Sequence, residues 1–169
     1  MARAEGRLQG QAPLVDMQRL VEATVAPADG PAGGVDWSAQ GLWKQPVGAA
    51  PEIRLRLRAR ADVWLTCQRC LQPARHTLEV DRVIRFVEGE ETAERLDEEG
   101  EEDVLALSRS LDLLELVEDE LILALPIVPR HETCPEPLVV SIEASAHIKE
   151  EGAGERDHPF AVLAQLKKR

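Results

Sequence analysis

Hydrophobic and polar side chains alternate one by one from residue 52 onward, which is the period of a strand with one buried face. Apolar residues occupy positions 53, 55, 57 and 59, and the positions between them hold Arg54, Arg56, Arg58 and Arg60. The same period continues over 63–67 and returns over 76–86, with a turn predicted between these two segments. The pattern therefore predicts two or three antiparallel strands that share an apolar face.

Residues 112–125 follow a helical period instead, because leucine and valine recur there at steps of three and four with acidic residues between them. This predicts an amphipathic helix that begins near Ser110 or Asp112 and is stopped by Pro126. A short strand is expected over 104–107. We therefore predict an α+β fold, in which this helix packs on an antiparallel sheet that could close into a barrel.

The predicted core domain spans 51–134, and the segments around it are poorer in periodic apolar positions. Residues 1–50 are expected to be partly ordered, with a loop in the Pro- and Gly-rich stretch 27–34. Residues 88–103 are so acidic that we expect a mobile loop. A flexible tail is predicted over 135–169. It ends in an apolar motif that we expect to dock on a partner through Phe160, Val162 and Leu163.

The formal net charge of −11 argues against a protein that coats nucleic acid without selectivity. The five aromatic rings are also too few for a platform that stacks bases. The charge is segregated, however. Residues 52–87 hold eight arginines against four acids, a net +4, whereas 88–120 hold two arginines against fifteen acids, a net −13. This division favours a selective factor with two oppositely charged faces.

The arginine ladder of the first predicted strand is the candidate RNA-binding surface. Alternate residues of a strand lie roughly 6.6–6.8 Å apart, close to the spacing of successive phosphates in an extended nucleic acid strand. We include two further arginines of the predicted sheet and its turn, so the candidates are Arg54, Arg56, Arg58, Arg60, Arg69 and Arg75. The alternative is a solvated strand face whose arginines pair with acids of the neighbouring strand or of the acidic run.

Four residues could bind a zinc ion. Cys67 and Cys70 form a Cys-x-x-Cys pair at the predicted turn, and His131 and Cys134 follow about sixty residues later. Three thiolates and one imidazole make up the four ligands of a closed tetrahedral zinc site. Two alternatives stay open: the cysteines are incidental, or they form a redox pair. The redox pair is disfavoured, because the motif lies between predicted strands rather than at a helix N-terminus.

No catalytic motif stands out, and we expect a protein that is not an enzyme. The acidic run and the acidic face of the predicted helix could instead hold a basic ribosomal protein, although a merely solubilising role is the simpler interpretation. The sequence shows neither a secretory signal nor an apolar stretch of the roughly 18 residues that a membrane helix needs. A cytoplasmic protein without membrane association is expected.

Three stretches, in this order along the chain, resemble the bacterial YceD family of large ribosomal RNA subunit accumulation proteins. They are VWLTCQRCL at 63–71, DLLELVEDELILALPIVPRH at 112–131 and PFAVLAQLK at 159–167. The resemblance implies a non-enzymatic factor for the synthesis, processing or stability of 23S rRNA. Its expected partner is that rRNA or a precursor of the large subunit. The resemblance also implies that some relatives carry a second Cys-x-x-Cys pair where this chain has His131 and Cys134.

Overall fold

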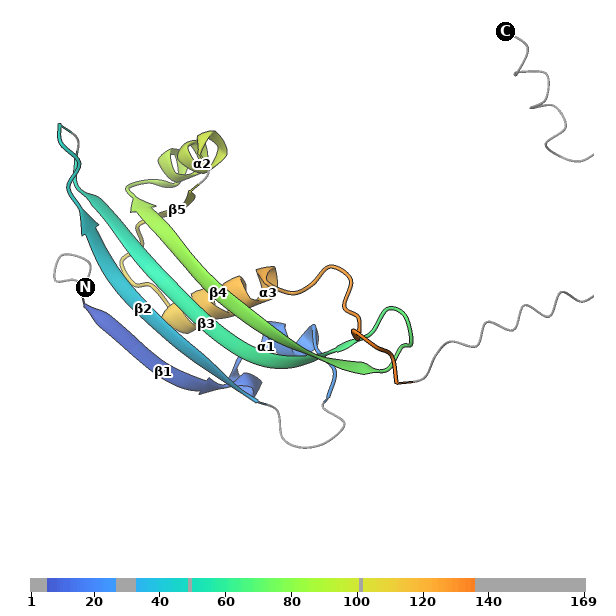
Figure 1. The fold of residues 1–169 in the computed structure, drawn as a ribbon. Helices are drawn as coiled ribbons and strands as arrows, with labels where there is room; N and C mark the ends of the chain where they lie inside the picture. Colours follow the sequence, from blue (N-terminus) through green and yellow to red (C-terminus); the bar gives the residue numbers. More distant parts are fainter. Residues whose placement is uncertain (1–5, 27–32, 49, 101, 136–169) are drawn as a thin grey trace, which may run out of the picture. The chain divides into compact units, whose positions relative to one another are not determined.

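A computed structural model describes residues 6–26, 33–48, 50–100 and 102–135. It contains a five-stranded sheet whose strands lie in the order in which they follow in the chain (Figure 1). The strands are β1 (Arg7–Pro13), β2 (Gly34–Lys44), β3 (Glu52–Thr66), β4 (Pro73–Val87) and β5 (Asp103–Ala106). The first four are antiparallel, and β5 runs parallel to β4. The α+β fold is therefore confirmed, with an open sheet rather than a barrel.

Strand β3 has the two faces that the alternating pattern predicts. Leu57 and Val63 are fully buried on one face, where the apolar residues of β3 form the centre of the hydrophobic core. The arginines point from the opposite face. Because a strand directs successive side chains to opposite sides, the alternation places the core and the charged surface back to back.

Helix α3 (Leu113–Leu123) packs on the apolar face of β3 and β4. The predicted start is confirmed, because the Asp112 carboxylate caps the helix and accepts hydrogen bonds from the backbone N–H groups of Leu114 and Glu115 at 3.0 and 3.2 Å. The helix ends at Leu123, and its C-cap Ala124 lies two residues before Pro126. Its buried side chains include Val117 and Leu121, so the amphipathic pattern is satisfied by the sheet.

The first 44 residues contribute more regular structure than the sequence predicts. Strands β1 and β2 extend the sheet, and a 3-10 turn (Leu14–Asp16) and the short helix α1 (Gln18–Glu22) lie between them. Leu14, Met17 and Leu20 are buried in the main core. Helix α1 contacts α3, so the N-terminal segment completes the apolar layer on this side of the sheet.

The acidic run forms a helix, α2 (Glu90–Glu99), and the mobile loop predicted for residues 88–103 is wrong. Glutamate, alanine, leucine and arginine are strong helix formers, and acidic side chains in a first helical turn interact favourably with the helix dipole. Ala93 is buried, and α2 contacts β5. The Asp97 carboxylate also accepts a hydrogen bond from the backbone of Val104 at 3.0 Å, which anchors the helix to this strand.

The predicted tail lies outside the described residues from position 136 onward, and so do Phe160, Val162 and Leu163. The described elements all belong to the compact unit Met1–Leu138. Within the described ranges, none of the helices has the length and apolar character needed to cross a bilayer.

Candidate metal centre and arginine face

Cys67 and Cys70 lie in the tight turn that joins β3 to β4. The backbone N–H of Cys67 donates to the carbonyl of Gln72 at 3.0 Å, and the N–H of Leu71 donates back to the carbonyl of Cys67 at 2.9 Å. Leu71 adopts a left-handed backbone conformation with φ of 60°. The chain reverses within these few residues, so both thiols are presented on the same side of the turn.

The second pair, His131 and Cys134, follows α3 and the extended segment around Pro129. That segment lies against the β3–β4 turn, where the backbone N–H of Gln68 donates to the carbonyl of Pro129 at 2.8 Å. The contact explains how residues sixty positions apart in the sequence come to one place. The turn and the segment after α3 together form a single site.

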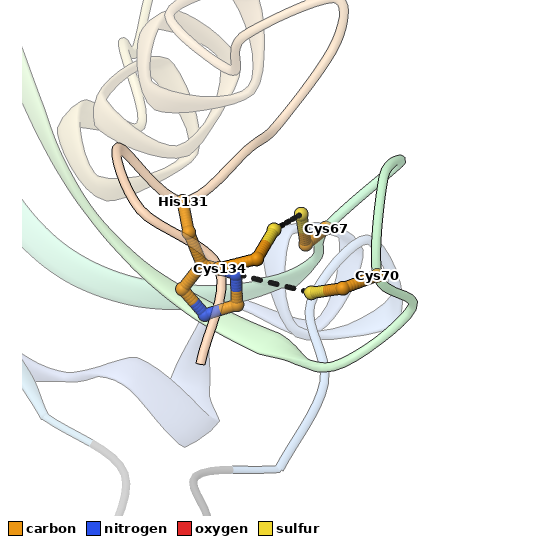
Figure 2. Close-up of side chains that lie close together, drawn as sticks. All are labelled: Cys67, Cys70, His131 and Cys134. Atoms are coloured by element: carbon orange, nitrogen blue, oxygen red, sulfur yellow. Dashed lines mark hydrogen bonds between the residues drawn. The ribbon is translucent and has the colours of Figure 1, made fainter. Parts of the chain in front are cut away.

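The structure brings the four predicted ligand residues together, as Figure 2 shows. One donor atom from each of Cys67, Cys70, His131 and Cys134 lies within 4.8 Å of all the others. Sγ of Cys67 is 3.9 Å from Sγ of Cys134, and Sγ of Cys70 is 3.4 Å from Nδ1 of His131. Around a tetrahedral zinc ion, bond lengths of about 2.3 Å to sulfur and 2.0–2.1 Å to nitrogen put such pairs about 3.8 and 3.5 Å apart.

The surrounding hydrogen bonds fit a metal ligand set as well. Nε2 of His131 donates to the carbonyl of Pro73 at 3.0 Å, which leaves Nδ1 free to face Cys70. Nε of Arg69 donates to Sγ of Cys134 at 2.9 Å, and Nη2 of Arg69 donates to the carbonyl of His131 at 3.1 Å. The Arg69 backbone N–H also points at Sγ of Cys67, 3.5 Å away. Arg69 thus donates to two of the three free cysteines, and its guanidinium compensates negative charge at Cys134.

The environment separates the acidities of the two thiols in the turn. Burial raises the pKa of Cys67, but hydrogen bonds from the backbone of Cys70, His131 and Arg69 outweigh it and lower that pKa to about 5. Burial also raises the pKa of Cys70, and the neighbouring sulfurs raise it further. Cys67 is thus favoured as a thiolate even without a cation. Deprotonation of the other thiols would add negative charge beside it, and a cation bound between the sulfurs would make that deprotonation favourable.

Three of the candidate arginines on β3 lie on the exposed face of the sheet and pair with acids of β4. Arg56 and Arg58 share the carboxylate of Asp81 at 2.8 and 3.1 Å. Arg60 lies 3.1 Å from Glu79. Hydrogen bonds from Arg56, helped by Arg58, lower the pKa of Asp81 to about 2. The cross-strand pairing considered as the alternative is present.

The remaining candidates have distinct surroundings. Arg75 pairs with Asp62 at 2.7 Å and stays exposed at the end of the face near the turn. The Arg54 side chain is only 14% exposed, and its guanidinium donates two hydrogen bonds of 2.9 Å to Glu102 and one of 3.0 Å to Glu52. Arg69 is directed at the cysteine cluster. Arg54 and Arg69 therefore make structural contacts that the other four arginines lack.

Sequence reasoning missed a row of amides and a hydroxyl on the same face. Gln9 and Gln11 of β1, with Ser38 and Gln40 of β2, lie beside the arginines in the strand register. Gln9, Gln11 and Ser38 line a shallow hollow of about 580 Å³ together with Arg58 and Arg60. Gln40 lines a smaller hollow of about 30 Å³. The alternation of apolar residues at 35, 37 and 39 with polar residues between them is the signal that would have identified β2.

Comparison with known proteins matches this chain to a family over the segments that form the cysteine cluster and most of the arginine face. The profile of the family "Large ribosomal RNA subunit accumulation protein YceD" matches residues 55–167, a range that includes the cluster and most of the arginine face. A protein of the same name from Haemophilus influenzae is 38% identical over 118 residues, which cover 69% of this chain and 67% of the relative. No solved structure matches. The chain belongs to the YceD family.

Proposed function

We propose that the protein is a cytoplasmic, non-catalytic factor for the accumulation of 23S rRNA and hence for assembly of the large ribosomal subunit. The observation that carries this proposal is the family match, which covers most of β3, the strands β4 and β5, helix α3 and both halves of the cysteine cluster. The name of the Haemophilus influenzae relative describes accumulation of large-subunit ribosomal RNA. Binding to the rRNA or to a precursor of the large subunit is the mode of action that the charged sheet face supports.

Cells that lack the gene test this function. Expression of the wild-type chain should restore the ratio of 23S to 16S rRNA, measured on denaturing gels, and the yield of large subunits in sucrose gradients. The profile of precursor ends, mapped by primer extension, separates a defect in processing from a defect in synthesis. An unchanged 23S level in the deletion strain would overturn the proposal.

We infer that the four-residue cluster holds a structural zinc ion. Three thiolates and one imidazole fill all four positions of a tetrahedral site, so no position stays open for a reacting water. The ion would join the β3–β4 turn to the segment after α3 and so add to the hydrogen bonds that Gln68, Arg69 and His131 make between them. Its role is thus to hold the end of the sheet in shape rather than to take part in chemistry.

The proposed RNA contact uses the exposed arginines of the sheet, and their exposed fractions support a choice among the six candidates. Arg56, Arg58, Arg60 and Arg75 have side chains 42–63% exposed, so a phosphate can reach them. Their partner carboxylates are about as accessible, and exposed ion pairs of this kind are worth little. A phosphate can therefore replace a carboxylate at small cost. Arg54 and Arg69 are not part of the proposed RNA contact, because Arg54 holds Glu102 and Arg69 holds the cysteine cluster.

Reversal of Arg56, Arg58 and Arg60 to glutamate should abolish ultraviolet crosslinking to large-subunit rRNA in cells. The matched control is Arg95→Glu on α2, because Arg95 also pairs with a single exposed acid, Glu99 at 3.0 Å. Circular dichroism would establish that both variants fold. Retained crosslinking in the triple variant would exclude this face as the RNA contact.

A second candidate function, escort of a basic ribosomal protein without RNA contact, is favoured by one observation. A hollow of about 310 Å³ between β5 and α3 combines apolar Leu105 and Leu123 with four acids, Asp97, Asp103, Asp119 and Glu120. Such a surface could accept the apolar stem and the charge of a lysine or arginine. A basic protein that stays bound after nuclease treatment, and is lost when Asp103 and Asp119 become lysine, would favour this function.

A further inference from the structure

We propose that the hollow around Ser38, on the sheet face opposite α3, seats a segment of single-stranded RNA. This inference rests on the proposed function and specifies the ligand of the arginine face. It assigns a role to side chains of β1 and β2 that the charge pattern alone does not identify.

Three register rows build the site across β1, β2 and β3. Gln11, Asp36 and Arg60 form one row, and Gln9, Ser38 and Arg58 form the next. A third row consists of Arg7, Gln40 and Arg56. Paired residues of neighbouring strands present their side chains on the same face. The second and third rows therefore place a hydroxyl or an amide directly beside an arginine, whereas Asp36 lies between Gln11 and Arg60 in the first. The rows repeat roughly every 6.7 Å along the strands.

Ser38 is the reason that the surface is hollow. Its short side chain lies in the middle row between the longer Gln9 and Arg58, so the floor of the hollow is at backbone level. The hollow measures about 580 Å³, and a second, smaller one of about 30 Å³ adjoins it at Arg7, Gln40 and Arg56. The size and shallow form suit one or two nucleotides of a strand that continues along the sheet.

The charges around the hollow are arranged for an anion. The carboxylates that pair with the β3 arginines belong to Asp81 and Glu79 of β4, on the side of β3 away from the hollow. The one acid that lines it, Asp36, accepts a hydrogen bond from Nε2 of Gln11 at 2.6 Å. Arg58 and Arg60 therefore offer donors toward the hollow while their positions are held from the other side.

The chemistry of the lining favours unpaired RNA over other polyanions. Guanidinium groups bind phosphate with charge-assisted hydrogen bonds, while amides and a hydroxyl can both donate to and accept from base edges and the ribose 2′-hydroxyl. Base edges are open to side chains in single strands, whereas an A-form duplex hides them in a narrow major groove. An acidic protein segment would use the arginines but would leave the amide rows without a matching pattern.

Fluorescence anisotropy with a short labelled single-stranded RNA of mixed sequence tests the proposal on the full chain. Ser38→Phe fills the hollow without changing charge, and Val83→Phe is its matched control, since Val83 lies on the same face but beyond β3. Arg58→Ala removes one proposed phosphate contact, and Arg95→Ala on α2 removes an equal charge elsewhere. Thermal melts establish that each variant folds.

We expect Ser38→Phe and Arg58→Ala to weaken binding about tenfold or more, and both controls to stay close to wild type. Arg58→Ala should also reduce the slope of log K against log salt by about one phosphate contact. A matched RNA duplex should bind more weakly than the single strand. Unchanged binding of Ser38→Phe would overturn the proposal, and so would a preference for polyglutamate over RNA, which would indicate an acidic protein partner.

The same variants in cells separate this inference from the proposed function. Loss of RNA binding together with a lowered 23S level for Ser38→Phe supports both. If Ser38→Phe restores 23S rRNA as well as wild type does, the hollow does not serve accumulation, and the proposed function stands. If the wild-type chain itself fails to restore 23S rRNA, the proposed function is wrong whatever the hollow binds in solution.

Discussion

The imidazole of His131 is oriented by the carbonyl of Pro73, which accepts a hydrogen bond from Nε2 at 3.0 Å. A carbonyl can only accept, so this contact places the ring proton on Nε2 and leaves the lone pair of Nδ1 facing Sγ of Cys70. Pro73 is the first residue of β4. The start of one strand thus sets the tautomer of a residue far along the chain.

We predict that the purified protein contains equimolar zinc and that His131 coordinates it through Nδ1. Elemental analysis measures the metal, and ¹⁵N NMR of the imidazole distinguishes a metal-bound Nδ1 from a protonated one. Cys67→Ser should release zinc and lower Tm, because metal binding contributes directly to folding. Gln68→Ala is the control, since Gln68 is exposed and lies in the same turn. Full thermal stability after chelation would contradict a structural metal.

Arg69 should increase the affinity for zinc without being a metal ligand itself. It donates to Sγ of Cys134 and to the carbonyl of His131, and a Cys3His site with Zn²⁺ carries one excess negative charge that a guanidinium offsets. We expect Arg69→Ala to weaken zinc binding about 10–100-fold in a competition with a chromophoric chelator. Arg69→Lys keeps the charge but not the forked geometry, so it should lie between Ala and wild type. Equal affinities for all three would exclude this role.

The strand β3 and the helix α3 could be predicted because each alternates at a single clear period between core and surface. The arginines at every second position predict strand β3 and its buried face, and the leucines after Asp112 predict helix α3 and its buried face. The four cluster residues could be predicted from ligand type and the Cys-x-x-Cys spacing. That the four side chains lie close together depends on the path of the chain after Pro126, and no local sequence pattern specifies that path.

Helix α2 and the pairing of the arginines could not be predicted, for two physical reasons. The many like charges of residues 88–103 indicated a loop although the run contains good helix formers, and the contacts that anchor α2 come from β5, a strand of only four residues. Cross-strand pairing depends on register, which the sequence leaves open. The choice of Asp81 as the shared partner of Arg56 and Arg58 therefore emerged only with the sheet.

Two arginines four positions apart on β3, Arg54 and Arg58, should differ in their effect on stability. Arg54 is 14% exposed and holds Glu102 through two hydrogen bonds, whereas Arg58 is 52% exposed and shares Asp81 with another arginine. Urea denaturation of Arg54→Ala should show a loss of about 1–2 kcal/mol, from hydrogen bonds between charged and partly buried groups. Arg58→Ala should stay within about 0.5 kcal/mol of wild type. The reverse order would refute the division of these residues into structural and accessible ones.

Leu71 should be a site where glycine is favoured. Its φ of 60° lies in the left-handed region, which costs a residue with a side chain roughly 1–2 kcal/mol, and its side chain is 72% exposed. Leu71→Gly should therefore leave Tm unchanged or raise it, although glycine also loses more entropy on folding. Leu71→Val should lower Tm, because a β-branched side chain fits this conformation poorly. A lower Tm for Gly than for Val would contradict the conformational argument.

Glu118 should be the main attachment of the N-terminal segment to α3. It is buried, and its carboxylate accepts hydrogen bonds from the backbone N–H of Leu20 at 3.1 Å and from Arg19 at 3.0 and 3.2 Å. Glu118→Ala leaves a buried N–H without its acceptor and should reduce the free energy of unfolding by about 1–3 kcal/mol. Glu118→Gln keeps an acceptor and should cost less. The control is Glu115→Gln, since Glu115 is exposed on the same helix.

The pH dependence of unfolding provides an independent check on the same carboxylate. Burial raises the pKa of Glu118, but the hydrogen bonds from Leu20 and Arg19 outweigh this and leave it below its ordinary value. A carboxyl whose pKa is lower in the folded state contributes stability above its unfolded pKa of about 4.3, and this contribution disappears as the pH falls through the folded value. The difference in unfolding free energy between wild type and Glu118→Gln should therefore be constant near neutral pH. It should shrink in urea titrations below about pH 4, and a gap that persists in acid would show that the charge of Glu118 is not what the N-terminal segment needs.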